Sequence, residues 1–162
     1  MFNTTIATQI YAKICFEATN SQKKIIENLS EYLSDDDFSR IFVLNGYAGT
    51  GKTTLIAALV GALKDLNIKP ILLAPTGRAA KVLAQYAQEK AFTIHKRIYR
   101  QRTNADYESK FSLDFNREQG AVFIVDEASM LSDSTGDGAL FGSGSLLEDL
   151  AVSYTHLRAH ET

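Results

Sequence analysis

Two N-terminal stretches repeat apolar residues every three or four positions, a spacing typical of amphipathic helices. The first, residues 6–14, is short and weakly patterned. The second begins near Ser21, and either Ser21 or Asn20 can cap its N-terminus. Two further helices are expected, one from about Lys52 to Leu66 and one capped by Thr76. The predicted buried stripe of this last helix consists of Val82, Leu83, Tyr86 and Ala87.

Three short apolar runs, residues 41–44, 70–74 and 121–125, lack the helical spacing and predict strands buried on both faces. Because strands and helices alternate, the sequence predicts an α/β fold with a parallel sheet and helices on both faces. Residues 101–120 are polar and aperiodic, so they form either a surface excursion or a small inserted hairpin. Residues 132–145 are rich in glycine and serine and predict a mobile loop.

Composition narrows the class of protein. The chain has 162 residues, 45% of them hydrophobic and 22% charged, which fits one soluble globular domain. The net charge of -2 does not by itself indicate a nucleic-acid partner. A single cysteine, Cys15, cannot build a disulfide framework and is expected to be a small buried apolar residue in a reducing compartment. Without a signal-peptide pattern or an apolar run of membrane-spanning length, the sequence predicts a cytoplasmic protein with no membrane partner.

The last stretch, residues 152–162, has no pattern that fits a helix or strand. Its two histidines, His156 and His160, have the spacing of a metal pair on a helix, but no Glu or Cys arrangement accompanies them, so we expect no metal there. The peptide from Ser153 to Thr162 resembles translated sequencing-adapter DNA. We therefore expect the natural sequence to stop near Leu150.

A glycine-rich segment joins the first predicted strand to the next helix. Its glycines let the backbone curl so that N–H groups converge on a phosphate at the positive end of the helix dipole. Lys52 then supplies a charge for the β- and γ-phosphates of ATP, and the Thr53 hydroxyl ligates Mg²⁺. The alternative is a chance match, which the strand-before, helix-after context argues against. The nucleotide-binding residues predicted from this P-loop are Gly46, Tyr47, Ala48, Gly49, Thr50, Gly51, Lys52, Thr53 and Thr54.

An acidic pair, Asp126 and Glu127, follows the third predicted strand, at the end where parallel sheets place their ligands. Asp126 is expected to hold Mg²⁺ directly or through water. Glu127 is expected to polarise the attacking water as a general base, which makes it a catalytic residue together with Lys52. The alternative is an acidic pair that caps the next helix.

Four motifs in this order resemble those of RecD-like superfamily I DNA helicases: residues 46–54, 74–80 (Ala-Pro-Thr-Gly-Arg-Ala-Ala), 93–95 (Thr-Ile-His) and 125–130 (Val-Asp-Glu-Ala-Ser-Met). The resemblance covers about residues 19–131. It implies a RecA-like P-loop NTPase fold that is incomplete, because only the first of two motor lobes is present.

Further roles follow from the resemblance. Gln22 matches the glutamine that reads the adenine edge, although a solvated glutamine in the first helical turn is the alternative. Two segments match regions that contact single-stranded DNA. Arg78 could equally be a surface arginine and His95 a structural histidine. The implied DNA-binding residues are Pro75, Thr76, Gly77, Arg78, Thr93 and His95.

Charge distribution supports a polyanionic partner. Residues 78–102 hold seven Lys or Arg against one acid, Glu89, an excess of six positive charges in a chain of net charge -2. Tyr99 within this stretch is expected to be available to stack on a base. A solvated helix face is the alternative, though such a face usually mixes both signs.

Together these features predict three parts: an N-terminal helical segment with the adenine-reading motif at 1–38, an ATPase lobe at 39–131 with the excursion at 101–120, and a loop with a non-native tail at 132–162. The expected function is the N-terminal motor lobe of an ATP-dependent helicase that moves on single-stranded DNA. Two alternatives stay open. One is a stand-alone P-loop ATPase that acts as a switch on protein partners, and the other is a nucleotide-binding fragment without turnover.

Overall fold

The computed structural model describes residues 2–35, 40–47, 49–103, 109–114, 118, 120–131 and 145–155. Ala48, most of the predicted glycine- and serine-rich loop, and both C-terminal histidines lie outside the described residues. The chain divides into two compact units. The first comprises Met1–Pro70 together with Gln85–Glu89, and the second comprises Ile71–Ala84 together with Lys90–Thr162. Each unit is described by itself.

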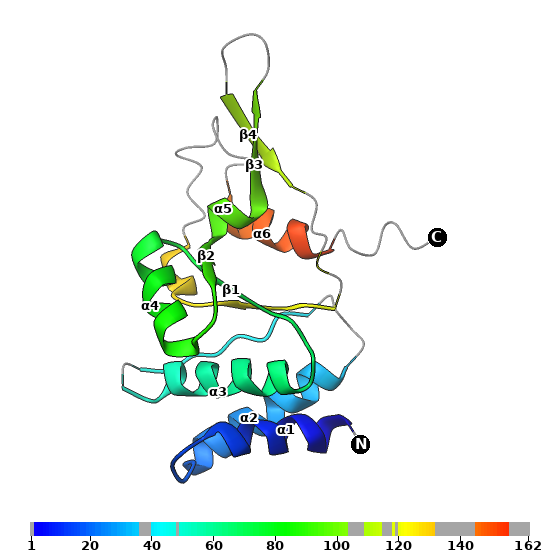
Figure 1. The fold of residues 1–162 in the computed structure, drawn as a ribbon, viewed down its shortest axis with the longest axis vertical. Helices are drawn as coiled ribbons and strands as arrows, with labels where there is room; N and C mark the ends of the chain where they lie inside the picture. Colours follow the sequence, from blue (N-terminus) through cyan, green and yellow to red (C-terminus); the bar gives the residue numbers. More distant parts are fainter. Residues whose placement is uncertain are drawn as a thin grey trace. The chain divides into compact units, whose positions relative to one another are not determined.

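Three helices build the first unit: α1 (Phe2–Lys13), α2 (Asn20–Ser34) and α3 (Lys52–Asp65). In Figure 1, α1 lies against both α2 and α3. The predicted four-residue repeat of α1 is confirmed, because Ile6 and Ile10 are almost fully buried. At the end of α1 the Lys13 stem lies over Gly61, and its ammonium pairs with Asp65 at 2.7 Å. A Cβ added to Gly61 would stand 3.2 Å from that stem, so glycine allows the close approach.

The segment after α2 differs from its prediction. Residues 41–44 are extended but form no strand, and Ile41 and Val43 are 72% and 71% exposed. A strand needs hydrogen bonds to a neighbouring strand, and no described residue pairs with this run. The expectation of burial on both faces is therefore wrong: only Phe42 and Leu44 are half-buried. Phe42 packs against the Tyr32 ring of α2 with ring centroids 5.5 Å apart.

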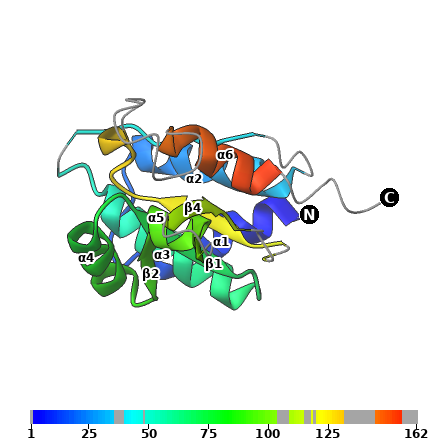
Figure 2. The same ribbon diagram turned by 90° about the horizontal axis from the view of Figure 1, so that it is seen from above.

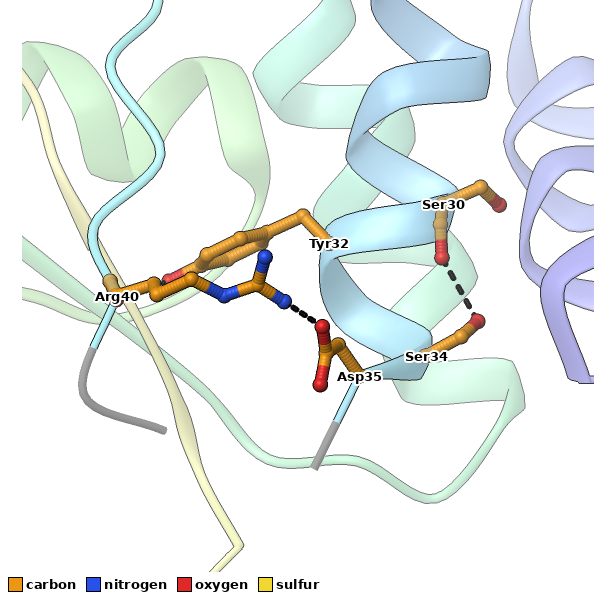
Figure 3. A network of polar contacts seen from close by, with 5 residues as sticks. All are labelled: Ser30, Tyr32, Ser34, Asp35 and Arg40. Carbon is orange, nitrogen blue, oxygen red and sulfur yellow. Dashed lines mark hydrogen bonds and ion pairs between the residues drawn. The ribbon is translucent and has the colours of Figure 1, made fainter. Parts of the chain in front are cut away.

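A polar network holds the start of this extended segment to the end of α2. Figure 3 shows Tyr32 reaching from the helix to Arg40, whose guanidinium turns toward the Asp35 carboxylate. The Tyr32 hydroxyl donates to the Arg40 carbonyl at 2.8 Å. Burial raises the pKa of Tyr32 above its ordinary value of 10.0, which keeps this donor protonated. The Ser34 hydroxyl donates to the Ser30 carbonyl at 2.7 Å and closes the last turn of the helix.

A three-stranded parallel sheet forms the centre of the second unit, in the order β2 (Ala91–Thr93), β1 (Pro70–Ala74), β5 (Val122–Val125). The parallel β1–β2 register pairs Leu72 with Ala91 and Ala74 with Thr93. Together with its helices, this sheet confirms the predicted α/β class. Two of its three strands, β1 and β5, match predicted runs, whereas residues 41–44 form no strand and β2 was not predicted.

Helix α4 (Gly77–Ala87) follows β1 and begins as predicted, since the Thr76 hydroxyl accepts the Ala79 N–H at 3.2 Å. Half of its predicted buried stripe is wrong. Leu83 and Ala87 are buried, but Val82 and Tyr86 are 43% and 62% exposed. Ala80 is buried instead, so the covered face follows the spacing 80, 83 and 87.

Beyond β2, helix α5 (Ile94–Ile98) leads into the antiparallel hairpin of β3 (Tyr99–Thr103) and β4 (Ser109–Leu113). The hairpin alternative for the polar excursion is therefore confirmed. After β5 come the short 3-10 helix η1 (Ala128–Met130) and then α6 (Leu146–Thr155). In Figure 2, α5 and α6 lie side by side, and they are in contact. The expectation that residues after 151 fit no element is wrong as far as Thr155, because α6 continues through them and Ser153 is buried.

A hydrophobic core joins the sheet of this unit to α5 and α6. Its buried residues are Ile71, Leu73, Ile94, Ile98, Tyr99 and Leu150. One polar pair lies beside these side chains: the Tyr99 hydroxyl donates to the Asp149 carboxylate at 2.6 Å, with Asp149 only 3% exposed.

Two further sequence expectations concern exposure. Cys15 is exposed, so its expected burial is wrong; it follows the end of α1 and lies in the connection to α2. Among the described residues, no helix combines the length and the apolar character that crossing a membrane requires.

Candidate functional site

The predicted phosphate loop begins at Gly46, shortly after the extended run 41–44, and leads into the first turn of α3. Gly51 is the N-cap of α3 and has φ +85°, and Gly49 has φ +78°. Residues other than glycine rarely adopt this left-handed backbone conformation, so both glycines are needed for the shape of the loop. The loop thereby ends at the N-terminus of a 14-residue helix, where unpaired N–H groups and the helix dipole favour an anion.

The Lys52 side chain folds back into this loop. Its ammonium donates to the Tyr47 carbonyl at 2.7 Å and also to the Gly46 carbonyl. The Thr50 hydroxyl donates to the same Tyr47 carbonyl at 2.9 Å. These neutral carbonyls hold the ammonium inside the loop, and anionic phosphate oxygens are stronger acceptors for it. The loop residues present therefore fit a phosphate chain.

The two threonines of the loop–helix junction lie in the first turn of α3. Thr53 is half-buried and Thr54 is exposed. At the other end of the loop, the Tyr47 ring is 87% exposed. The predicted loop residues are thus gathered around one turn, with Ala48 outside the described residues.

Gln22 contacts this same loop at Thr50, although the two residues are 28 positions apart in sequence. Its side-chain Nε2 donates to the Thr50 carbonyl at 3.3 Å. Gln22 also forms a capping box with Thr19, the true N-cap of α2. The expectation of a cap at Asn20 or Ser21 is therefore wrong, although the pattern Thr-x-x-Gln carried the signal of a capping box. The proximity of Gln22 to the loop argues against a merely solvated glutamine.

The acidic pair lies in the second unit, directly after β5. The Asp126 N–H donates to the Leu73 carbonyl at 3.0 Å and continues the pairing of β5 with β1. The Asp126 carboxylate accepts the Glu127 N–H at 2.9 Å, and the Glu127 carbonyl accepts the Met130 N–H at 2.9 Å. Glu127 is exposed and has φ +56°, an uncommon conformation for a residue other than glycine. Such conformations concentrate at functional sites.

The carboxyl edge of the sheet brings the other predicted residues of this unit together. β1 ends into Pro75 and Thr76, β2 ends at Thr93, and β5 ends into Asp126. The three strands are parallel, so these positions share the edge where open α/β sheets bind ligands. The hydroxyls of Thr76 and Thr93 both accept helix N–H groups, from Ala79 and Lys96 respectively, each at 3.2 Å. Both threonines therefore act as helix caps.

The remaining predicted DNA contacts differ in exposure. Gly77 and Arg78 are exposed at the start of α4, as a contact to a large partner requires. His95 is half-buried, with its ring against Tyr99 and the centroids 5.7 Å apart. Arg97 of the basic stretch is paired with Glu118 at 2.8 Å.

Tyr99 does not have the expected role of a base-stacking residue. Its side chain is 9% exposed, and its hydroxyl is engaged by Asp149. Burial, and then the hydrogen bond to Asp149, raise the pKa of Tyr99 well above its ordinary value. Tyr99 lies at the junction of α5 and β3 and faces the core, so its aromatic ring packs in the core.

No cluster of three or more His, Cys, Asp and Glu side chains that could hold a metal occurs in the part of the chain that the structure describes. Mg²⁺ commonly needs only one or two protein oxygens, because substrate phosphates and water complete its octahedron. A hydroxyl such as that of Thr53 and a carboxylate such as that of Asp126 are hard oxygen donors of the required kind. The donor chemistry therefore fits magnesium.

Comparison with known proteins identifies the class. The model of a family described as AAA domain matches residues 17–140, about three quarters of the chain. The chain therefore belongs to this AAA-domain family and has an α/β P-loop NTPase fold, and it is similar to RecD-like superfamily I helicases.

Individual relatives agree with this assignment. The chain is 30% identical over 117 residues to the ATP-dependent RecD2 DNA helicase of Deinococcus radiodurans, covering 70% of this chain and 15% of that protein. It is 37% identical over 92 residues to the ATP-dependent DNA helicase dda of Enterobacteria phage T4, covering 54% of this chain and 20% of that protein. An uncharacterized protein of Methanocaldococcus jannaschii is 32% identical over 116 residues, or 65% of this chain and 10% of that protein. The chain thus spans a fifth or less of the length of these relatives.

Proposed function

We propose that this chain is the N-terminal motor lobe of an ATP-dependent DNA helicase, which binds and hydrolyses ATP and couples turnover to movement along single-stranded DNA in the full-length protein. The observation that carries the proposal is the phosphate loop, with the Lys52 ammonium folded into it and the Gln22 amide fastened to it. The motor-domain family and the two DNA helicases among the relatives support the helicase part. A cytoplasmic location, expected from the cysteine usage, is part of this proposal.

ATP binding would use the first unit. Backbone N–H groups from Gly46 through Thr54 would receive the phosphates, and the Lys52 ammonium would exchange its two carbonyl acceptors for phosphate oxygens. Gln22 would read the adenine edge, since an amide both donates and accepts. These residues bind and orient the nucleotide.

Hydrolysis would add the acidic pair of the second unit. Thr53 and Asp126 would hold Mg²⁺, which supplies positive charge that offsets charge developing on the phosphates. Glu127 would take a proton from the attacking water as general base. Because Glu127 is exposed and its backbone is tied to both Asp126 and Met130, its side chain can meet a water without a change in the turn.

DNA contact would use the carboxyl edge of the sheet. Arg78 and the N-terminus of α4 offer charge and N–H groups for a backbone phosphate. Pro75, Thr76, Thr93 and His95 complete the proposed contact set. The Thr76 and Thr93 oxygens already accept N–H groups, so their hydroxyl protons are the groups they would donate to DNA.

The test is ATP turnover by the full-length protein with and without single-stranded DNA of mixed sequence. We expect turnover that rises with DNA and that disappears in Lys52→Ala. Turnover that is indifferent to DNA would favour the ATPase switch, and nucleotide binding without turnover would favour the inactive fragment. Either result contradicts the proposal.

A further inference from the structure

The Gln22 amide is held at both ends. Its Oε1 accepts the backbone N–H of Thr19 at 2.9 Å, and its Nε2 donates to the Thr50 carbonyl at 3.3 Å. The reciprocal bond of the capping box, from the Gln22 N–H to the Thr19 hydroxyl, is 3.3 Å long. A capping box alone needs only the first and third of these bonds. The bond to Thr50 is additional, and it connects the start of α2 with the phosphate loop.

The fit at the loop is close. A Cβ added to Gly51 would stand 2.8 Å from Gln22 Nε2, nearer than real Cβ atoms come. Glycine at this position therefore serves both the left-handed backbone and the space that the amide fills.

These two bonds determine which end of the amide is oxygen and which is nitrogen. If the amide turned over, its NH₂ would face the Thr19 N–H and its oxygen would face the Thr50 carbonyl. Two donors would then oppose each other at one end and two acceptors at the other. The network thus assigns the orientation and holds it.

An amide has two N–H donors and two acceptor lone pairs. The bonds to Thr19 and Thr50 engage one of each, so one donor and one acceptor remain on an amide whose oxygen and nitrogen ends are fixed. The N6–N7 edge of adenine offers one donor and one acceptor, whereas the corresponding edge of guanine offers two acceptors. An amide held in one orientation matches the adenine edge. Against guanine, the amide oxygen would face another acceptor, which is unfavourable.

We propose that Thr19 is a positioning residue for base selection: its backbone N–H locks the Gln22 amide in the orientation that accepts adenine and rejects guanine. This inference rests on the proposed nucleotide site. Without the Thr19 N–H, only the bond to Thr50 orients the amide, so the order of its donor and acceptor is less firmly fixed and the discrimination weakens. Thr19 acts here only through Gln22.

The chain offers a matched pair of variants. Thr19 has φ -64°, within the range that the proline ring imposes, so Thr19→Pro removes the N–H and the hydroxyl together. Thr19→Ala removes only the hydroxyl. The difference between the two variants isolates the N–H that holds the amide.

The experiment measures the dissociation constants of ADP, GDP and inorganic tripolyphosphate by calorimetry on the full-length protein. We expect the unmodified protein to prefer ADP over GDP by about tenfold or more, as a good bidentate base contact does. Thr19→Ala should keep that ratio within about twofold, whereas Thr19→Pro should lower it by about threefold or more; tripolyphosphate affinity should match between the two variants. Equal ADP-to-GDP ratios in the two variants, or no preference in the unmodified protein, would overturn the inference.

Two features keep this test decisive. If the unmodified protein bound neither diphosphate nor tripolyphosphate, the nucleotide site itself would fail, which is a different result from an unchanged ratio. If Thr19→Pro did not fold, hydrogen exchange of the Thr19 amide would decide in the unmodified protein. Slow exchange of that amide in the ADP complex is expected, and exchange at the rate of an exposed amide would overturn the proposal.

Discussion

Replacing Gly51 by alanine tests whether the loop and the Gln22 amide are fitted to each other. The backbone at Gly51 has φ +85°, and an L-residue pays about 1–2 kcal/mol for that conformation. The new Cβ would also stand 2.8 Å from Gln22 Nε2, so the amide must move and its bond to Thr50 is lost. A lost hydrogen bond adds about 1 kcal/mol, so Gly51→Ala should cost about 2–3 kcal/mol.

Gly49 supplies the control. Its backbone is equally left-handed at φ +78°, but no atom lies within 4 Å of an added Cβ. Gly49→Ala should therefore lower the free energy of unfolding only by the conformational cost, about 1–2 kcal/mol. The two variants should differ by about 1 kcal/mol, or roughly 2–4 °C in the midpoint of thermal unfolding for a chain of this size.

The assay is thermal unfolding followed by far-UV circular dichroism without nucleotide, for each variant alone and in combination with Gln22→Ala. In the Gln22→Ala background the extra cost of Gly51→Ala should vanish, because the amide that it displaces is gone. Equal costs for Gly49→Ala and Gly51→Ala in the unmodified background would refute the reasoning.

Three other changes have defined outcomes. Lys52→Ala should lower tripolyphosphate affinity by at least about tenfold by calorimetry, because a charge-assisted donor is lost; unchanged affinity would contradict that role. Arg78→Ala should weaken single-stranded DNA binding alike for all sequences and reduce the salt slope by about 1 in fluorescence anisotropy. Tyr99→Phe should cost about 1–3 kcal/mol in urea unfolding, because Asp149 loses a buried donor. Burial raises the pKa of Tyr99 above 10.0, so the protonated tyrosine's contribution is complete below pH 10 and is lost as the pH rises through the raised pKa. The unmodified chain should accordingly lose stability above pH 10 more steeply than Tyr99→Phe does.

Local signals predicted much of the fold. The strand at residues 70–74 and the cap at Thr76 depend on neighbours in sequence, and both are as predicted. The phosphate loop needs glycine at fixed spacings, so its left-handed turns at Gly49 and Gly51 could be anticipated from residue type. The N-cap at Thr19 was missed, although Thr-x-x-Gln is itself a local pattern.

The errors concern long-range partners. Residues 41–44 have the composition of a buried strand, but composition does not provide a neighbouring strand. Tyr99 was expected to meet a base, and its partner is Asp149, 50 residues later. Both Tyr86 and Leu83 suit an apolar helix face, and tertiary packing alone decides that Leu83 is buried and Tyr86 is exposed.

The contact between Gln22 and the loop likewise depends on partners that are distant in sequence. The resemblance to helicases suggested that Gln22 reads a base, yet no pattern in the sequence joins it to Thr50. That bond depends on how α2 and the loop meet in space. The candidate site is thus a prediction from residue type, whereas the contacts that orient its groups depend on the three-dimensional structure.

The most direct test of the central claim is Glu127→Gln in the full-length protein, with ATP affinity and single-turnover hydrolysis measured in the same preparation. Glutamine keeps the size of the side chain but cannot take a proton from water. ATP affinity should stay within about twofold of the unmodified protein, and the hydrolysis rate should fall by roughly 10²–10⁴. Hydrolysis at the unmodified rate would show that Glu127 is not the general base, and the assignment of this chain as a motor ATPase lobe with that acidic pair would be contradicted.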